Sequence, residues 1–175
     1  FSAGAVGSHG PYRFSKNQEV EAQYMANNVS KVVLNNFDSI KTTFVSKLNM
    51  IHLPLYLRES NLRVSDNIVI RPWLFYKLFG KEETFINLLQ IGNIVFAGTP
   101  CDFSGELVPE IDSVARSRNL NLVITSFNGG YVGYITKDKW YYLNTYETRL
   151  MNWFGTGNGA YLSEVIKGVL PEEQN

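Results

Sequence analysis

The spacing of apolar and polar residues changes several times along this chain of 175 residues, from the period of a strand to that of a helix and back. Residues 1–6 are small and apolar and run into a glycine-rich turn at 7–11, which predicts a core strand ending in a turn. Residues 40–57 alternate and are rich in Thr, Phe, Val, Ile and Leu, which predicts a second strand. Pro54 has no N–H to donate, so we expect the end of this strand to lie at the edge of a sheet or in an irregular stretch.

Three further strands are predicted in the second half of the chain. Residues 83–89 and 94–97 form two apolar runs, and the turn residues 90–93 between them are typical of a hairpin. Residues 120–127 form a strong strand pattern, which the turn at 128–130 ends.

Helical spacing recurs in three places between these strands. Ser15 is placed to cap a helix predicted over residues 16–34. A second helix is predicted over residues 104–118, with Pro109 in its first turns, and a last one over residues 160–169. Strands that alternate with helices predict an α/β fold, a mixed β-sheet flanked by helices.

Composition excludes several classes of protein. Hydrophobic residues make up 45% of the chain, aromatic residues 14% and charged residues 18%, which excludes intrinsic disorder. Sixteen basic residues balance sixteen acidic ones, so nucleic acid is not an expected partner. The single cysteine, Cys101, excludes an internal disulfide framework and a thiolate metal cluster. No apolar run reaches the roughly 18 residues of a membrane-spanning helix.

The beginning of the chain has neither an initiator Met nor a basic segment ahead of an apolar stretch. Its first residues already have the pattern of a core strand. We therefore expect these 175 residues to be a piece of a longer protein whose upstream part is missing.

Three glycine-rich turns share one design, in which an apolar strand feeds a turn with polar groups. They are residues 7–11, 98–105 and 128–134. Ligands of α/β sheets bind outside the carboxyl ends of strands, and glycine lets backbone N–H groups approach an anion or a developing oxyanion. The turns are therefore either parts of a shared site or simply tight turns.

The histidines and the serine of the first turn give no complete catalytic arrangement. Ser8 and His9 are adjacent, and adjacent residues of a strand point to opposite faces, so Ser8 is interpreted as a turn residue. His52 lies in an apolar strand and is interpreted as a packed, hydrogen-bonded histidine. Two histidines cannot supply a His-rich zinc site from this chain alone.

Acidic and phenolic groups follow the later strands. Asp102 stands where a catalytic carboxylate often projects, and also where it could cap the helix that starts near Ser104. The phenols are interpreted as packing at the edge of the core; they are Tyr131, Tyr134, Tyr141, Tyr142 and Tyr146.

Four segments together resemble the neutral (non-lysosomal) ceramidase family, zinc amidases that cleave the N-acyl bond of ceramide. Residues 4–11 are similar to that family's Val-Gly-Asp-Val-Ser-Pro turn, and residues 96–104 to its Gly-x-Pro-Gly-Glu-Phe segment. Residues 131–136 are similar to its Tyr-Thr-His-Tyr-Ile-Thr, followed by Tyr146-Glu147 as in its Arg-Tyr-Glu. Residues 154–157 are similar to its Tyr-Gly-Pro, and the tyrosine spacing is the most specific part of the match.

The resemblance implies a zinc site to which this chain contributes two ligands. The family holds zinc by two histidines, a glutamate and a tyrosine; Asp102 stands at the place of the glutamate and Tyr134 at that of the tyrosine. Tyr146 matches a second tyrosine that suits hydrogen bonding to the reacting carbonyl. The two histidines belong to the family's first half and are expected upstream of this chain. Zinc would lower the pKa of a bound water toward about 7.

The first turn departs from the family pattern. The family's active-site serine falls on Gly10, and Ser8 replaces its aspartate. Either Ser8 takes over through a shifted turn, or zinc-bound water acts alone, or this branch has no ceramidase activity. Asp102 is one methylene shorter than the glutamate that it replaces, and His9 adds an imidazole that could serve as acid or base.

The resemblance thus implies that residues 1–175 are the C-terminal half of a zinc-dependent amide hydrolase domain. It implies an N-acylated lipid or a smaller acylated amide as substrate, contact with a membrane surface, and a secreted, periplasmic or cell-envelope location. The alternatives are a non-catalytic relative that binds a lipid or glycan, and an enzyme that uses Ser8 covalently without metal.

Overall fold

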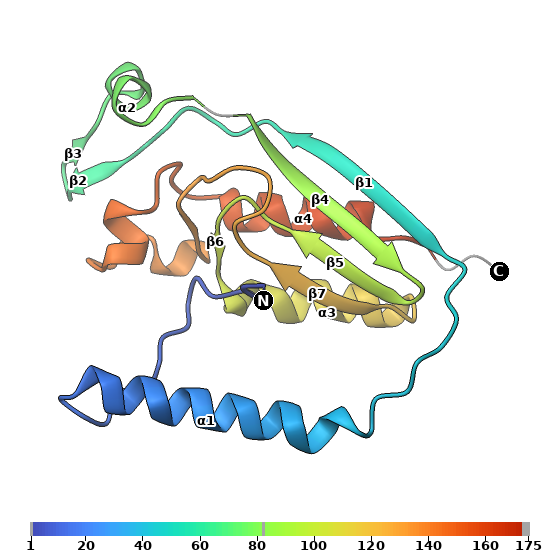
Figure 1. Cartoon of the computed structure of the whole chain (residues 1–175). Helices are drawn as coiled ribbons and strands as arrows, with labels where there is room; N and C mark the ends of the chain where they lie inside the picture. The colour runs from blue at the N-terminus through green and yellow to red at the C-terminus, as the bar shows by residue number, and fades with distance from the viewer. Residues whose placement is uncertain (1, 82, 173–175) are drawn as a thin grey trace. The chain divides into compact units, whose positions relative to one another are not determined.

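The structure, a computed structural model, describes residues 2–81 and 83–172, and the chain divides into two compact units. One unit comprises residues 10–45, and the other residues 1–9 together with 46–175. Figure 1 shows the elements of each. Within the described ranges, every helix is too short or too polar to cross a membrane.

The smaller unit is built around one helix, α1 (Gln18–Phe37). Asn17 caps it, since its side-chain oxygen accepts a hydrogen bond of 2.9 Å from the Glu19 N–H. The helix expected over residues 16–34 is confirmed, but the expected cap is wrong. Ser15 Oγ instead accepts from the Asn17 N–H at 3.1 Å, which ties down the turn ahead of the helix.

A mixed four-stranded sheet forms the larger unit, in the order β1-β4-β5-β7. The strands are β1 (Leu48–Leu55), β4 (Thr84–Ile91), β5 (Ile94–Gly98) and β7 (Asn121–Thr125). β1 and β5 each run antiparallel to β4, and β7 is parallel to β5. Both the hairpin between β4 and β5 and the edge position of Pro54 are confirmed.

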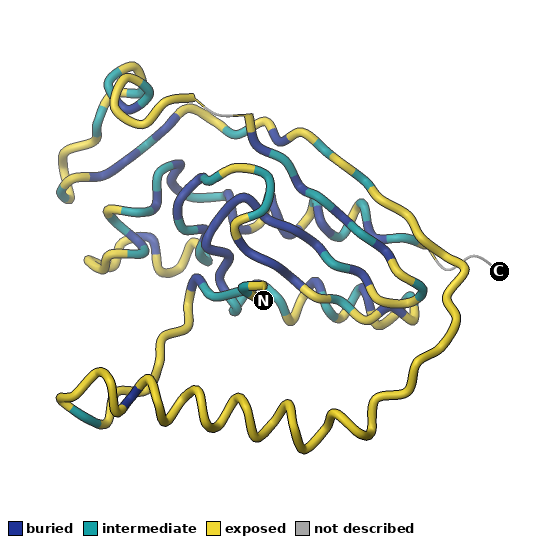
Figure 2. The backbone as a smooth tube through the Cα atoms, viewed as in Figure 1, coloured by how far each residue is buried: buried dark blue, intermediate teal, exposed yellow. Residues whose placement is uncertain are grey.

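Helices pack on the buried face of this sheet. A short turn of 3₁₀ helix, η1 (Gly105–Leu107), leads into α3 (Val108–Ser117), which connects the parallel strands β5 and β7. α4 (Asn158–Val169) packs beside α3. Side chains of β4, β5, β7, α3 and α4 form one core, and Figure 2 shows β5 and the segment after it as mostly buried. The predicted fold class, a mixed α/β sheet flanked by helices, is confirmed.

Two of the expected strands differ in the structure. Residues 2–6 form no strand, and Phe1 lies outside the described residues. One residue rather than a ladder holds this segment: Ser126 donates its N–H to the Ala3 carbonyl and its hydroxyl to the Gly4 carbonyl. The strand expected over residues 40–57 is regular only in β1, because only β1 has a partner strand, β4.

Several short elements were not predicted. They are β2 (Arg63–Ser65), β3 (Ile68–Val69), α2 (Pro72–Phe79), η2 (Asp138–Trp140) and the π-helical turn η3 (Tyr146–Leu150). Of these, α2 had a usable signal, since its first residue is proline, which favours the first position of a helix.

Candidate functional site

Two very short strands set Asp102 beside Tyr134. β6 (Asp102–Phe103) pairs in parallel with β8 (Tyr134–Ile135), with Asp102 opposite Tyr134. The Asp102 N–H donates to the Gly133 carbonyl at 3.0 Å, which fixes this register. β6 follows the carboxyl end of β5 (Figure 1), the position at which α/β sheets commonly bind ligands.

Residues of all three glycine-rich turns make backbone contacts here: Gly7 of the first, residues 100–103 of the second, and Val132 and Gly133 of the third. Gly7 donates its N–H to the Phe103 carbonyl at 2.8 Å, and Val132 donates to the Pro100 carbonyl at 2.7 Å. A Cβ on Gly7 would collide with the carbonyl of Asp102, so this close approach requires glycine. Gly133 has a φ of +76°, and a Cβ there would collide with the carbonyl of Met151.

The Asp102 carboxylate is buried, with 6% of the residue exposed. The Tyr131 hydroxyl donates to Asp102 Oδ2 at 2.6 Å. No cation among the described residues forms a salt bridge with Asp102. Burial, and then the hydrogen bond to Asp102, raise the pKa of Tyr131, so this phenol stays a donor at neutral pH. Asp102 is not a helix cap, because Ser104 caps η1.

Two more phenols, Tyr134 and Tyr146, lie near Asp102 and Tyr131. The rings of Tyr134 and Tyr146 meet edge to face, with centroids 5.8 Å apart. Burial raises the pKa of Tyr134, and the charges of Asp102 and of Tyr146 act in the same direction. Tyr146 is 54% exposed, so its hydroxyl is open to a ligand. We call Asp102, Tyr131, Tyr134 and Tyr146 the Asp102 cluster.

Ser8 and His9 lie against the beginning of η1. Ser8 Oγ accepts a hydrogen bond of 3.0 Å from the Gly105 N–H. The His9 ring packs so closely on Gly105 that a Cβ there would collide with it. His9 Nδ1 lies 3.1 Å from the Ala5 carbonyl and therefore donates to it, which leaves Nε2 as an acceptor. The side-chain hydrogen bonds of Ser8 and His9 go to Gly105 and Ala5 and not to each other, which agrees with the expectation for adjacent residues.

His52 has the structural role that its position indicates. It stacks on Phe85, with ring centroids 4.2 Å apart, and its Nδ1 lies 2.6 Å from Asn87 Oδ1. It takes no part in the Asp102 cluster.

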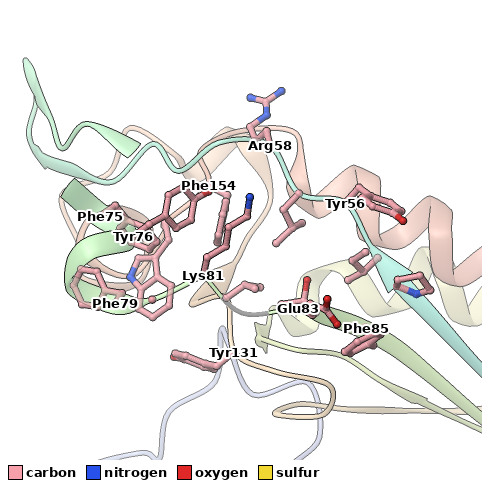
Figure 3. Close-up of a pocket in the computed structure, with 17 residues that line it drawn as sticks. Tyr56, Arg58, Phe75, Tyr76, Phe79, Lys81, Glu83, Phe85, Tyr131 and Phe154 are labelled. Atoms are coloured by element: carbon pink, nitrogen blue, oxygen red, sulfur yellow. The ribbon is translucent and has the colours of Figure 1, made fainter. Parts of the chain in front are cut away.

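A pocket of about 500 Å³ adjoins the Asp102 cluster and shares Tyr131 with it. Figure 3 shows Phe75, Tyr76 and Phe79 of α2 gathered on one side together with Phe154. Its charged lining residues are Arg58, Lys81 and Glu83. The pocket was not predicted, because α2 was missed and no local pattern pairs α2 with residues 131 and 154.

The donor set of the Asp102 cluster fits part of a metal site. Asp102, a carboxylate, and Tyr134, a phenol, are paired residues of β6 and β8. Across residues 2–81 and 83–172, no group of three His, Cys, Asp or Glu side chains could hold a metal ion. Zinc usually has four ligands or three and a water, so these two oxygens would need further ligands from elsewhere.

Comparisons with known proteins show the fold. No protein-family model matches the chain, and no curated protein matches it. Among solved structures, a neutral ceramidase from Pseudomonas aeruginosa is similar over 70% of this chain and 28% of its own, with 13% identity and a TM-score of 0.52. A ceramidase complexed with C2 is similar over 59% of this chain and 17% of its own, with 16% identity and a TM-score of 0.45. The resemblance to neutral ceramidase is thus confirmed as a likeness of fold, over less than a third of that protein's length.

Proposed function

We propose that this chain is part of a hydrolase of neutral ceramidase type, the C-terminal half of its catalytic domain, which cleaves the N-acyl amide bond of a lipid or smaller substrate. The observation that carries the proposal is the placement of Asp102 opposite Tyr134, next to two further phenols, in a fold shared with a neutral ceramidase. A buried carboxylate that forms no salt bridge with a described residue, at the carboxyl end of a sheet strand, supports a functional role.

Asp102 and Tyr134 are the residues that would hold a zinc ion. The remaining ligands, two histidines by the family resemblance, come from chain outside these 175 residues. A bound zinc ion supplies Lewis acidity and lowers the pKa of a coordinated water.

The chain's own groups supply the rest of the chemistry. The exposed Tyr146 hydroxyl donates to the carbonyl oxygen of the substrate, where negative charge develops. His9 Nε2 is free to accept or return a proton, because Nδ1 is engaged with Ala5. Ser8 has a smaller part in this proposal, since its Oγ already accepts the Gly105 amide hydrogen bond.

The aromatic pocket suits the apolar part of an acylated substrate. Its lining is mostly aromatic and aliphatic, and its volume of about 500 Å³ is in the range of small-molecule sites. Trp73 and Leu78 of α2 are 64% and 62% exposed, which supports contact of α2 with a membrane surface. A secreted, periplasmic or envelope location belongs to the same proposal, on the resemblance alone.

The test is metal content and hydrolysis in the full-length protein that contains this chain. We expect about one zinc per chain and turnover of a fluorescent N-acyl amide. Asp102→Asn should lose both. Asp112→Asn is the matched control, because Asp112 lies on α3 in an ion pair with Arg116, and it should keep both. Wild-type protein without zinc and without turnover would contradict the proposal.

The aromatic pocket also favours a second candidate, a non-catalytic relative that binds a lipid or glycan. Binding of lipid vesicles or oligosaccharides without turnover of any amide or ester would support it. An enzyme that uses Ser8 covalently would instead lose all turnover in Ser8→Ala while it kept its zinc or needed none.

A further inference from the structure

Tyr131 belongs to two neighbouring features, the surroundings of the buried Asp102 carboxylate and the aromatic pocket. Its hydroxyl donates to Asp102 Oδ2 at 2.6 Å, and its ring lines the pocket. The distance is that of a charge-assisted O–H···O⁻ hydrogen bond, which is shorter and stronger than a neutral one.

Two aromatic rings pack against the ring of Tyr131, and this packing fixes the orientation of its hydroxyl group. Trp153 meets it edge to face, with centroids 5.3 Å apart and an interplanar angle of 90°. The ring centroid of Phe127 lies 6.1 Å from that of Tyr131. The backbone next to Tyr131 is fixed, because the Val132 N–H donates to the Pro100 carbonyl. A donor whose orientation is set by packing also sets the rotation of the carboxylate that accepts from it.

We propose that Tyr131 is a positioning residue for Asp102. It holds Oδ2, so that the lone pairs of Oδ1 are the ones presented to a metal ion. This inference rests on the proposed function for the role of Asp102 as a ligand. It adds a residue to which the family resemblance gave no role.

Because the aspartate side chain is short, the carboxylate of Asp102 needs the hydrogen bond from Tyr131 to fix its orientation. Asp102 is shorter than glutamate by one methylene, about 1.5 Å, and carries no salt bridge to a described residue. Without Tyr131, one oxygen of a buried carboxylate would lose its hydrogen-bond donor, and the carboxylate would rotate to find another. Partners that orient metal ligands typically contribute 10-fold to 100-fold to metal affinity.

The test is zinc affinity of the full-length protein, measured by competition with a chromophoric chelator. Tyr131→Phe removes the hydroxyl and keeps the ring against Trp153. We expect its zinc affinity to fall by about 10-fold to 100-fold. Tyr142→Phe, which removes a hydroxyl from a residue that is 80% exposed, is the matched control and should bind zinc as the wild type does. Turnover should show a lower kcat with an unchanged KM, because the pocket wall remains.

A second pair of variants shows whether Tyr131 acts through Asp102. In Asp102→Glu the carboxylate is displaced, so adding Tyr131→Phe should change zinc affinity less than twofold. An equal loss in both backgrounds would overturn the proposal, as would wild-type affinity in Tyr131→Phe.

A metal-free measurement separates this inference from the proposed function. The hydrogen-bonded Tyr131 hydroxyl proton should give a slowly exchanging proton NMR signal that is absent in Tyr131→Phe and shifted in Asp102→Asn. Absence of that signal from the wild type would overturn the inference even if zinc binds. A signal present in a protein that binds no zinc would overturn the zinc proposal and, with it, the positioning of Asp102 for a metal, while leaving the hydrogen bond in place.

Discussion

Asp102 and Arg63 are two buried charged residues of the larger unit that form no salt bridge with a described residue, and their surroundings differ. Asp102 and Arg63 are each 6% exposed. Arg63 donates to the carbonyls of Tyr141 and Thr148, and its guanidinium carbon lies 4.1 Å from the centroid of the Tyr141 ring. Asp102 accepts a hydrogen bond of 2.6 Å from the Tyr131 hydroxyl, and its carboxylate also interacts with the half-buried phenol of Tyr134.

Under the proposed function, this difference separates a structural role for Arg63 from a functional role for Asp102. The groups around Arg63 are backbone and ring atoms that fix residues 141–148 in one arrangement. That segment carries Tyr146, so Arg63 supports the site from a distance. In the proposed function, the carboxylate of Asp102 binds a metal ion, next to the exposed side chain of Tyr146. Removing Arg63 should therefore affect folding first, and removing the charge of Asp102 should affect chemistry first.

The largest effect is expected for Asp102→Asn on hydrolysis. If Asp102 is a metal ligand, as proposed, its loss should lower kcat/KM about 1,000-fold, which is about 4 kcal/mol of transition-state stabilisation. The free energy of unfolding should change by less than about 1 kcal/mol, because the amide oxygen still accepts from Tyr131 and no buried charge remains. Urea unfolding and steady-state kinetics measure the two. A large loss of stability in Asp102→Asn would show that Asp102, like Arg63, has mainly a structural role.

Arg63→Met should have the opposite profile. Two carbonyl oxygens lose their donor and the Tyr141 ring loses its cation, so the free energy of unfolding should fall by about 3 kcal/mol. Arg116→Met, at a side chain that is 77% exposed, should stay within about 0.5 kcal/mol in the same urea titration. Equal stability of the two variants would show that Arg63 does not hold the segment.

Tyr146→Phe sharpens the functional side of the comparison. The change removes the exposed hydroxyl but keeps the ring against Tyr134. We expect kcat to fall by about 10-fold to 100-fold with little change in KM, because the lost hydrogen bond is to the developing oxyanion. Tyr142→Phe is the control in the same kinetic assay. Unchanged turnover in Tyr146→Phe would show that Tyr146 contributes packing but no catalytic hydrogen bond.

The smallest effect concerns Cys101, the neighbour of Asp102, which burial keeps uncharged. Burial raises the pKa of Cys101 to about 12 from its ordinary 9.0; the Asp102 charge adds to this, and the Thr99 side chain acts in the opposite direction. A raised pKa favours the folded state fully below pH 9, and this contribution is lost as the pH rises toward 12. At pH 10 the loss should be about 1 kcal/mol.

Urea unfolding at pH 8 and pH 10 measures this loss, and Cys101→Ala should show a smaller decline between the two. A thiol reagent should react with Cys101 at pH 8 only in the unfolded protein. Rapid labelling of the folded protein would contradict the burial of this thiol.

Much of the fold follows from local pattern. The hairpin of β4 and β5, the helices α3 and α4, and the edge position of Pro54 were all predicted, because periodicity and proline chemistry act within a few residues. The strand expected over residues 1–6 was wrong, since apolar composition predicts burial but cannot supply a partner strand. The helix α2 was not predicted, because it is short and the only sequence feature that indicated it was a proline at its first position, Pro72.

The sequence by itself also determined which residue types gather at the site: a carboxylate after β5, glycines that allow close backbone approach, and tyrosines at fixed spacing. Only the tertiary structure decided that Asp102 lies opposite Tyr134, and that Tyr131, 29 residues away in sequence, is its donor. Only the tertiary structure brings Arg63 to the carbonyl of Tyr141, 78 residues further on. It also brings α2 and Tyr131 together in the lining of one pocket. Period and composition specify which face of an element is buried, but the partner that buries it is set by how distant segments pack together.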